Sequence, residues 1–175
     1  MKSQIIFTLA TVLLLAAGCS KDNEELDSTD SPTRVKIYMH DQPIDYQQVN
    51  IDLQAIELKG SGEDQLIELG EFAGIYNLLD YQNEIDTLVG DSLINFAYLS
   101  QIRLILGPEN SVMVDSVLHP MQTPSAQQSG LKINVNQSLA EMDTLIISFD
   151  FDANESVHQL GNGDYQLHPV IHLDE

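Results

Sequence analysis

The run from Asp150 to Asn154 carries oxygen ligands at alternate positions, because a single residue separates Asp150 from Asp152 and Asp152 from Asn154. Hard oxygen donors in this D-x-D-x-N arrangement suit Ca²⁺, although the EF-hand pattern fails at Gly161, where its bidentate glutamate belongs. On a strand, Asp150 and Asp152 would share one face and repel each other unless a cation, Arg103 or Lys132 lay beside them. The sequence therefore allows one cofactor, a Ca²⁺ ion at Asp150, Asp152 and Asn154.

A second group of polar residues fills the stretch from Thr123 to Ser129, which is small or polar throughout apart from one proline. Hydroxyl and amide groups on such a loop suit a sugar or a peptide backbone, and loops on rigid scaffolds often carry binding sites. The same groups can instead cap the backbone of an ordered connection. The candidate ligand-binding residues are Thr123, Ser125, Gln127, Gln128 and Ser129.

The five histidines form no recognised zinc motif, since the sequence has no H-E-x-x-H pattern and only one cysteine. His168 and His172 alternate with Leu167 and Ile171, so we expect both histidines to face solvent. The sequence also has no nucleophile elbow, phosphate-binding loop or dinucleotide fingerprint. These patterns indicate a protein that is not an enzyme.

The single cysteine, Cys19, ends a segment with the features of an export signal. Lys2 precedes an uncharged apolar run, which is too short to span a bilayer, and small residues follow. The stretch Leu15-Ala16-Ala17-Gly18-Cys19 resembles the bacterial lipobox, with Ala16 where leucine is usual. The resemblance implies cleavage after Gly18 and attachment of acyl chains such as palmitate to Cys19, which would anchor the protein to a membrane. A plain secretion signal that happens to contain a cysteine is the alternative.

The stretch after the cysteine, residues 20–25, resembles the acidic tract that directs lipoproteins to the cell surface in Bacteroidetes. We therefore expect an outer-membrane location on the cell surface, with a periplasm-facing anchor as the alternative. Polar and acidic residues continue to Pro32, and this segment has too few apolar side chains for burial to offset the conformational entropy lost on ordering. This predicts a signal peptide at 1–18, a flexible tether at 19–32 and one domain at 33–175. The formal charge of −20 excludes nucleic acid as a partner.

The domain reads as a series of strands, because apolar and polar residues alternate in many short segments. The alternation slips at Ile56, which suggests a bulge, and Leu66–Leu69 would pair back on the preceding strand as a hairpin. Only 83–94 has helical spacing, through Ile85, Leu88 and Val89. Pro169 suggests an edge position or a bulge. We predict an all-β fold, an antiparallel sandwich of immunoglobulin-like or prealbumin-like type, with at most one short helix. The alternating segments are 34–39, 49–55, 101–106, 112–114, 131–135, 145–149 and 165–173.

Several stretches resemble a bacterial family known as domain of unknown function 4382. The most specific of them is 123–132, and the resemblance covers nearly the whole domain. It implies a β-sandwich lipoprotein domain and implies no activity. The family's pattern tends to have basic residues where His168 and His172 stand, which argues against a metal at these positions. The other matching stretches are 75–80, 98–104, 149–153, 161–163 and 169–171.

Three functions remain open at this point. The first is a non-enzymatic module of the cell envelope that binds a glycan, a peptide or another envelope protein. The second is a structural, fimbria-like subunit that adds strands to its neighbours. The third is an unrecognised hydrolase whose acids would be Asp150 and Asp152.

Overall fold

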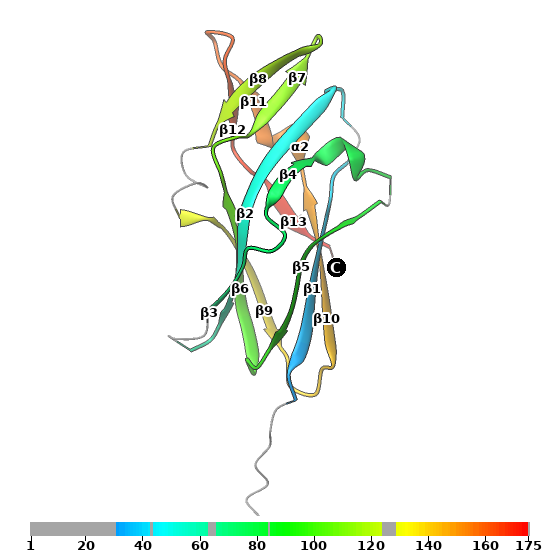
Figure 1. The fold of residues 1–175 in the computed structure, drawn as a ribbon, viewed down its shortest axis with the longest axis vertical. Helices are drawn as coiled ribbons and strands as arrows, with labels where there is room; N and C mark the ends of the chain where they lie inside the picture. The colour runs from blue at the N-terminus through cyan, green and yellow to red at the C-terminus, as the bar shows by residue number, and fades with distance from the viewer. Residues whose placement is uncertain (1–30, 43, 63–65, 84, 124–128, 175) are drawn as a thin grey trace, which may run out of the picture.

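The computed structural model describes residues 31–42, 44–62, 66–83, 85–123 and 129–174, and they form two packed β-sheets (Figure 1). The all-β sandwich expected from the sequence is confirmed. No helix among these residues is long and apolar enough to cross a membrane. The strands are β1 (Thr33–His40), β2 (Gln48–Gly60), β3 (Leu66–Leu69), β4 (Gly74–Asn77), β5 (Thr87–Ile94), β6 (Tyr98–Leu106), β7 (Ser111–Val114), β8 (Val117–Gln122), β9 (Leu131–Ser138), β10 (Thr144–Phe151), β11 (Val157–Gln159), β12 (Tyr165–Leu167) and β13 (Ile171–Leu173).

The smaller sheet has the order β13-β10-β1-β5, and the larger has the order β11-β12-β8-β7-β2-β6-β9, with β3 and β4 paired to β2. Most described pairs are antiparallel. Two are parallel, namely β1 with β10 and β8 with β12. Two short helices lie wholly within the described residues: the 3₁₀ turn η1 (Leu78–Asp80) and the helix α2 (Ala153–Ser156).

The core lies between the two sheets and follows the alternation of the strands. In β1, Val35, Ile37 and Met39 are buried, and Ile147 and Phe149 of β10 lie beside them in register. Full burial of a side chain of this size contributes about 1.5–3 kcal/mol. The alternation in the sequence is therefore the main determinant of which face of each strand packs inward.

The predicted bulge and hairpin of β2 are confirmed. The register of β2 with β6 shifts between Leu53 and Ala55, so the buried face changes parity just before Ile56. Strand β3 pairs back on β2, with Ile67 opposite Leu58. An irregularity in the hydrophobic pattern was a reliable sign of a local change in pairing.

The helix expected at 83–94 is wrong, because β5 occupies Thr87–Ile94 and pairs with β1. The register shifts at this pairing, with Ile37 opposite Gly90 and Tyr38 opposite Leu88, so Val89 is an extra residue in β5. A glycine inside a helix costs about 1 kcal/mol relative to alanine. In the strand, Gly90 permits close approach, since a Cβ there would lie 3.2 Å from the Ile37 side chain. Pairing with the edge of β1 therefore decides the structure of this segment, and the weak helical spacing of its apolar residues does not.

The strand pattern at 165–173 is divided between the two sheets. Strand β12 joins the larger sheet and β13 joins the smaller one, and Pro169 lies in neither. A proline cannot donate a ladder hydrogen bond, which suits a crossing between sheets. The chain therefore passes from one layer to the other at 168–170.

The long axis of the molecule separates two ends (Figure 1). At one end β1 begins at Thr33; we call it the Thr33 pole. At the other end are the turn between β7 and β8 at Asp115–Ser116 and the turn between β11 and β12 at 160–163; we call it the hairpin pole. Because β8 and β12 are parallel and in register at Met121 and Tyr165, their two turns lie at the same end of the larger sheet.

A buried polar network joins β2 to the loop after β6. The Asp52 carboxylate accepts a hydrogen bond from the Glu109 N–H at 3.0 Å, and the Asn110 side chain accepts one from the Asp52 N–H at 2.8 Å. Gly107 packs against Asp52 so closely that a Cβ on it would lie 2.0 Å from Asp52 Oδ2. The network satisfies the buried Asp52 carboxylate and requires a glycine beside it.

We predict that Gly107→Ala destabilises the protein by about 1–3 kcal/mol, because the added methyl group must displace Asp52 or Gln54. Gly161→Ala is the matched control, since a Cβ there meets nothing within 4 Å. Its effect should stay within about 0.5 kcal/mol. Urea denaturation followed by circular dichroism measures both. Equal free energies of unfolding of the two variants would show that the loop after β6 accommodates the added methyl group without loss of stability.

Candidate functional site

Three strands of the smaller sheet bring two histidines and an aspartate into one row. His40 of β1 lies opposite Asp150 of β10, and Asp150 lies opposite His172 of β13. Side chains that are directly opposite in a sheet share a face, with Cβ atoms about 4.5–5.5 Å apart. The Asp150 side chain is therefore placed between the two histidines.

Asp150 is almost completely buried, at 5% exposure, yet its carboxylate is only half satisfied. Oδ2 accepts a hydrogen bond from Gln42 Nε2 at 2.7 Å, whereas Oδ1 has no partner. An unpaired buried polar atom costs about 1–3 kcal/mol, and more when it is charged. Asp150 is thus an energetic liability to the fold as it stands.

Two further carboxylates join this row just beyond the end of β10. The N–H of Asp152 donates to the Val170 carbonyl at 3.0 Å, which continues the pairing of β10 with β13 by one residue. Asp152 therefore has the same parity as Asp150 and lies on the same face. Its Oδ1 accepts from the Glu155 N–H at 2.8 Å and caps α2, which fixes Glu155 one turn later.

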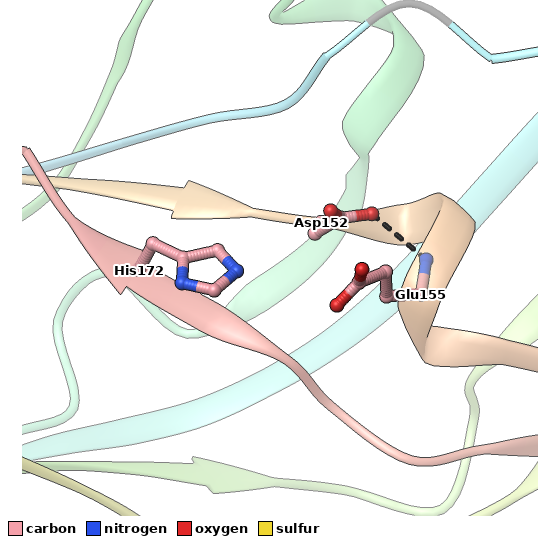
Figure 2. Close-up of side chains that lie close together, drawn as sticks. All are labelled: Asp152, Glu155 and His172. Atoms are coloured by element: carbon pink, nitrogen blue, oxygen red, sulfur yellow. Dashed lines mark hydrogen bonds between the residues drawn. The ribbon is translucent and has the colours of Figure 1, made fainter.

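Asp152, Glu155 and His172 converge. One ligand atom from each lies within 4.8 Å of the other two, and Figure 2 shows the two carboxylates and the imidazole turned toward one another. Glu155 and His172 are exposed and Asp152 is half-buried. We call Asp150, Asp152, Glu155 and His172 the carboxylate–histidine cluster.

The cluster is not neutralised by arginine or lysine in the way the sequence suggested. Arg103 contacts Glu57 at 3.3 Å and lies opposite Lys132, and both belong to the larger sheet. The expectation that Arg103 or Lys132 lies beside Asp150 and Asp152 is therefore wrong. The alternation of apolar and polar residues does not specify which of the two sheets a strand joins.

A second carboxylate, Asp41, is buried at the end of β1, at 3% exposure. Its Oδ1 accepts from the Ala153 N–H at 3.1 Å, and its Oδ2 has no partner. Burial raises the pKa of Asp41 above its ordinary value, and the negative charge of Asp150 adds to the rise. The Ala153 and Gln42 N–H groups and the Gln82 side chain oppose the rise, although Gln82 Nε2 donates to the Gln42 carbonyl at 3.1 Å.

The predicted Ca²⁺ ligands are only partly brought together. Asp152 and Asn154 line a polar pocket of about 480 Å³, and Gln42 on its wall holds the buried Asp150. Sequence reasoning did not identify Glu155 or Asp41 as site residues, and it did not place His172 beside Asp152. The exposure expected for His168 and His172 is confirmed. The sequence carried no signal that joined β1 to β10 in parallel, so it did not predict the row of His40, Asp150 and His172.

The predicted polar loop has one residue with a clear structural role. Thr123 is fully buried, and its hydroxyl accepts a hydrogen bond from Asn110 Nδ2 at 3.2 Å. Ser129 is exposed. Ser125, Gln127 and Gln128 lie outside the described residues, as do Cys19, the signal segment and nearly all of the tether. Thr123 therefore belongs to the buried network of Asp52 and Asn110.

The hairpin pole carries aliphatic side chains that have no place in the core. Val117 and Leu118 of β8 are about half exposed, and Leu160 lies exposed in the neighbouring turn. Asp115 and Asp164 flank them. Exposed aliphatic residues with a polar rim are typical of surfaces that contact another protein.

The fold defines a two-layer β-sandwich with a carboxylate–histidine cluster on one side and an aliphatic tip at one end. The family model described as "Domain of unknown function (DUF4382)" matches residues 32–169, so the chain belongs to this family. No curated protein and no solved structure matches the chain. The family confirms the resemblance noted in the sequence and supplies no activity.

We predict that Asp41→Asn stabilises the protein at neutral pH. The raised pKa means that the folded state binds the Asp41 proton more tightly than the unfolded chain, so this contribution is full below pH 3.8 and is lost as the pH rises through the folded pKa. The asparagine keeps an acceptor for Ala153 and removes the buried charge. The melting temperature should rise at pH 7 and change least near pH 3.

Asp91→Asn is the control, because its hydrogen bond with Arg34 lowers the pKa of Asp91. This variant should lower the melting temperature at pH 7. If Asp41→Asn were destabilising at pH 7, the carboxylate would be making a favourable interaction in its ionised form.

Proposed function

We propose that this protein is a lipid-anchored, non-enzymatic module of the cell envelope that binds a protein partner through its hairpin pole. The observation that carries the proposal is the separation of the two poles. The chain enters the sandwich at the Thr33 pole, and the β7–β8 and β11–β12 turns lie at the opposite end (Figure 1). Val117, Leu118 and Leu160, which belong to or follow directly on these turns, are exposed. A module held at its Thr33 pole would present the hairpin pole outward.

The anchor in this proposal is Cys19, as the lipobox-like sequence implies. Its place before a polar, acidic stretch supports a tether that holds the domain away from the outer membrane. The acidic residues after Cys19 support display on the cell surface. Several acyl chains hold a protein firmly, whereas a single chain binds only marginally.

The chemistry of the hairpin pole favours a protein over a glycan. Val117, Leu118 and Leu160 offer apolar area, whereas sugar hydroxyls need several convergent polar groups. Because Asp115 and Asp164 flank the aliphatic residues and the chain has a formal charge of −20, the partner is expected to carry basic residues around its contact surface.

The proposal of a module without enzymatic activity fits the environments of Asp150 and Asp152, the two acids that a hydrolase would use. Asp150 is buried and held by Gln42, and Asp152 uses one oxygen to cap α2. The Asp152 carboxylate thus has a structural function that does not depend on a reaction, and the burial of Asp150 limits its access to a substrate.

We predict that Cys19→Ser moves the protein from the membrane fraction to the soluble fraction, because the thiol that would carry the acyl chains is gone. Ser20→Ala is the matched control and should leave the protein in the membrane fraction. Fractionation of native cells followed by mass spectrometry of the amino-terminal peptide measures both location and lipidation. Membrane attachment of Cys19→Ser would refute the anchor.

A photo-crosslinking amino acid in place of Leu118 tests the hairpin pole. On intact cells we expect one discrete adduct of defined mass, because this side chain would lie within the contact with the partner. The matched control replaces Leu66, which has nearly the same exposure, 51% against 53%, but lies on β3 near the Thr33 pole. Equal adducts at both positions, or none at Leu118, would contradict the proposed docking surface.

A further inference from the structure

We propose that Asp152, Glu155 and His172 bind one Zn²⁺ ion on the side of the smaller sheet, with Asp150 as the buried acceptor behind His172. The three ligand atoms lie within 4.8 Å of one another. Ligands of a tetrahedral Zn²⁺ ion are roughly 3.4 Å apart, given metal–ligand distances of about 2.0–2.2 Å. Since Glu155 and His172 are exposed, small rotations of these two side chains bring the donors into range.

The donor set decides the class of metal. Three protein ligands with a fourth position for water are the usual arrangement of an open Zn²⁺ site, and both imidazole and carboxylate groups bind Zn²⁺. Ca²⁺ takes six to eight oxygen ligands in proteins and does not use imidazole. The cluster as folded therefore fits Zn²⁺ better than the Ca²⁺ suggested by the alternate spacing of Asp150, Asp152 and Asn154.

The unsatisfied oxygen of Asp150 is the independent observation that points to a ligand. Asp150 lies directly opposite His172 on the same face of the sheet, and its Oδ1 has no partner although the residue is 95% buried. A histidine that binds a metal usually donates its other ring N–H to a carboxylate, which fixes the orientation of the ring. Metal binding by His172 would give Asp150 Oδ1 this missing hydrogen bond.

Electrostatics favours the same ligand. Three carboxylates of the cluster lie close together, and the two arginines of the chain pair elsewhere, with Asp91 and with Glu57. A divalent cation would offset this repulsion, which neither arginine relieves.

The ion would also have a structural effect, because its ligands come from two segments. Asp152 and Glu155 belong to the end of β10 and to α2, whereas His172 belongs to β13. The ladder between β10 and β13 has three residue pairs, over Phe149–Phe151 and Ile171–Leu173, with a single hydrogen bond beyond each end. A bound Zn²⁺ would close this short ladder and hold the last strand in the sheet.

The test is a titration of the full chain, purified in detergent and stripped with a chelator, with zinc chloride alone. Calorimetry should show one site per chain, and the melting temperature should rise with zinc concentration. His172→Ala and Glu155→Gln should each weaken binding by more than about 100-fold, and Asp150→Asn by about 10–100-fold, as expected for a residue that positions a ligand. Both ligand variants change exposed side chains, so they should fold.

His158 provides the matched control. It lies next to His168, with ring centroids 5.2 Å apart, and these two exposed histidines are an alternative place where zinc could bind. His158→Ala should leave zinc binding unchanged. The proposal would be overturned by loss of binding in His158→Ala, by unchanged binding in His172→Ala, by tighter binding of calcium than zinc, or by no zinc binding up to millimolar concentration.

Discussion

The parallel pairing of β1 with β10 is the constraint on which the rest of the structure depends. Seven residue pairs, from Arg34 with Thr144 to His40 with Asp150, join the beginning of the domain to a strand near its end. Such pairing closes a very long loop, so burial of apolar side chains must offset the entropy lost on ordering the chain. Val35, Ile37 and Phe149 are fully buried along the β1–β10 pairing, which we call the seam. Loss of the seam would separate β5 from β10 and β13 and divide the smaller sheet.

The same seam creates the chemistry of the cluster and its cost. A parallel register sets His40 beside Asp150, and the antiparallel addition of β13 then sets His172 on the other side. The end of the seam also buries Asp41 next to Asp150. Two buried carboxylates with one unpaired oxygen each lower the stability of the fold. Natural proteins tolerate such unsatisfied groups where a functional site needs them.

The sequence predicted those features that depend on local periodicity. Alternation located β1, β9 and β10, and the phase change at Ile56 located the bulge in β2, because each rests on which face of a strand is buried. Parity likewise predicted that His172 is exposed. The helix expected at 83–94 failed because three apolar residues with helical spacing also fit a bulged edge strand, and only the presence of β1 decides between them.

The site was less predictable than the fold, for a physical reason. The alternate spacing of Asp150 and Asp152 is visible in the sequence. His172 joins them through an antiparallel register across a turn-rich segment, which periodicity does not specify. Thr123 shows the converse, since a hydroxyl in a polar run became a buried partner of Asn110. A residue's type and neighbours suggest chemistry, whereas pairing between distant strands decides which groups meet.

The cluster and the hairpin pole are separate surfaces, but one segment connects them. The chain leaves β12 in the larger sheet, crosses at 168–170 past Pro169, and enters β13 with His172. The His168 N–H donates to the Ser156 carbonyl at 2.8 Å, and the Val170 N–H donates to the Ser156 hydroxyl at 2.9 Å, so the crossing is fixed to the end of α2. An ion held by Asp152, Glu155 and His172 would therefore hold both ends of this crossing. Strand β12 pairs with β8 at Met121 and Gln122, so the crossing also joins the cluster to the strand that begins at the hairpin pole.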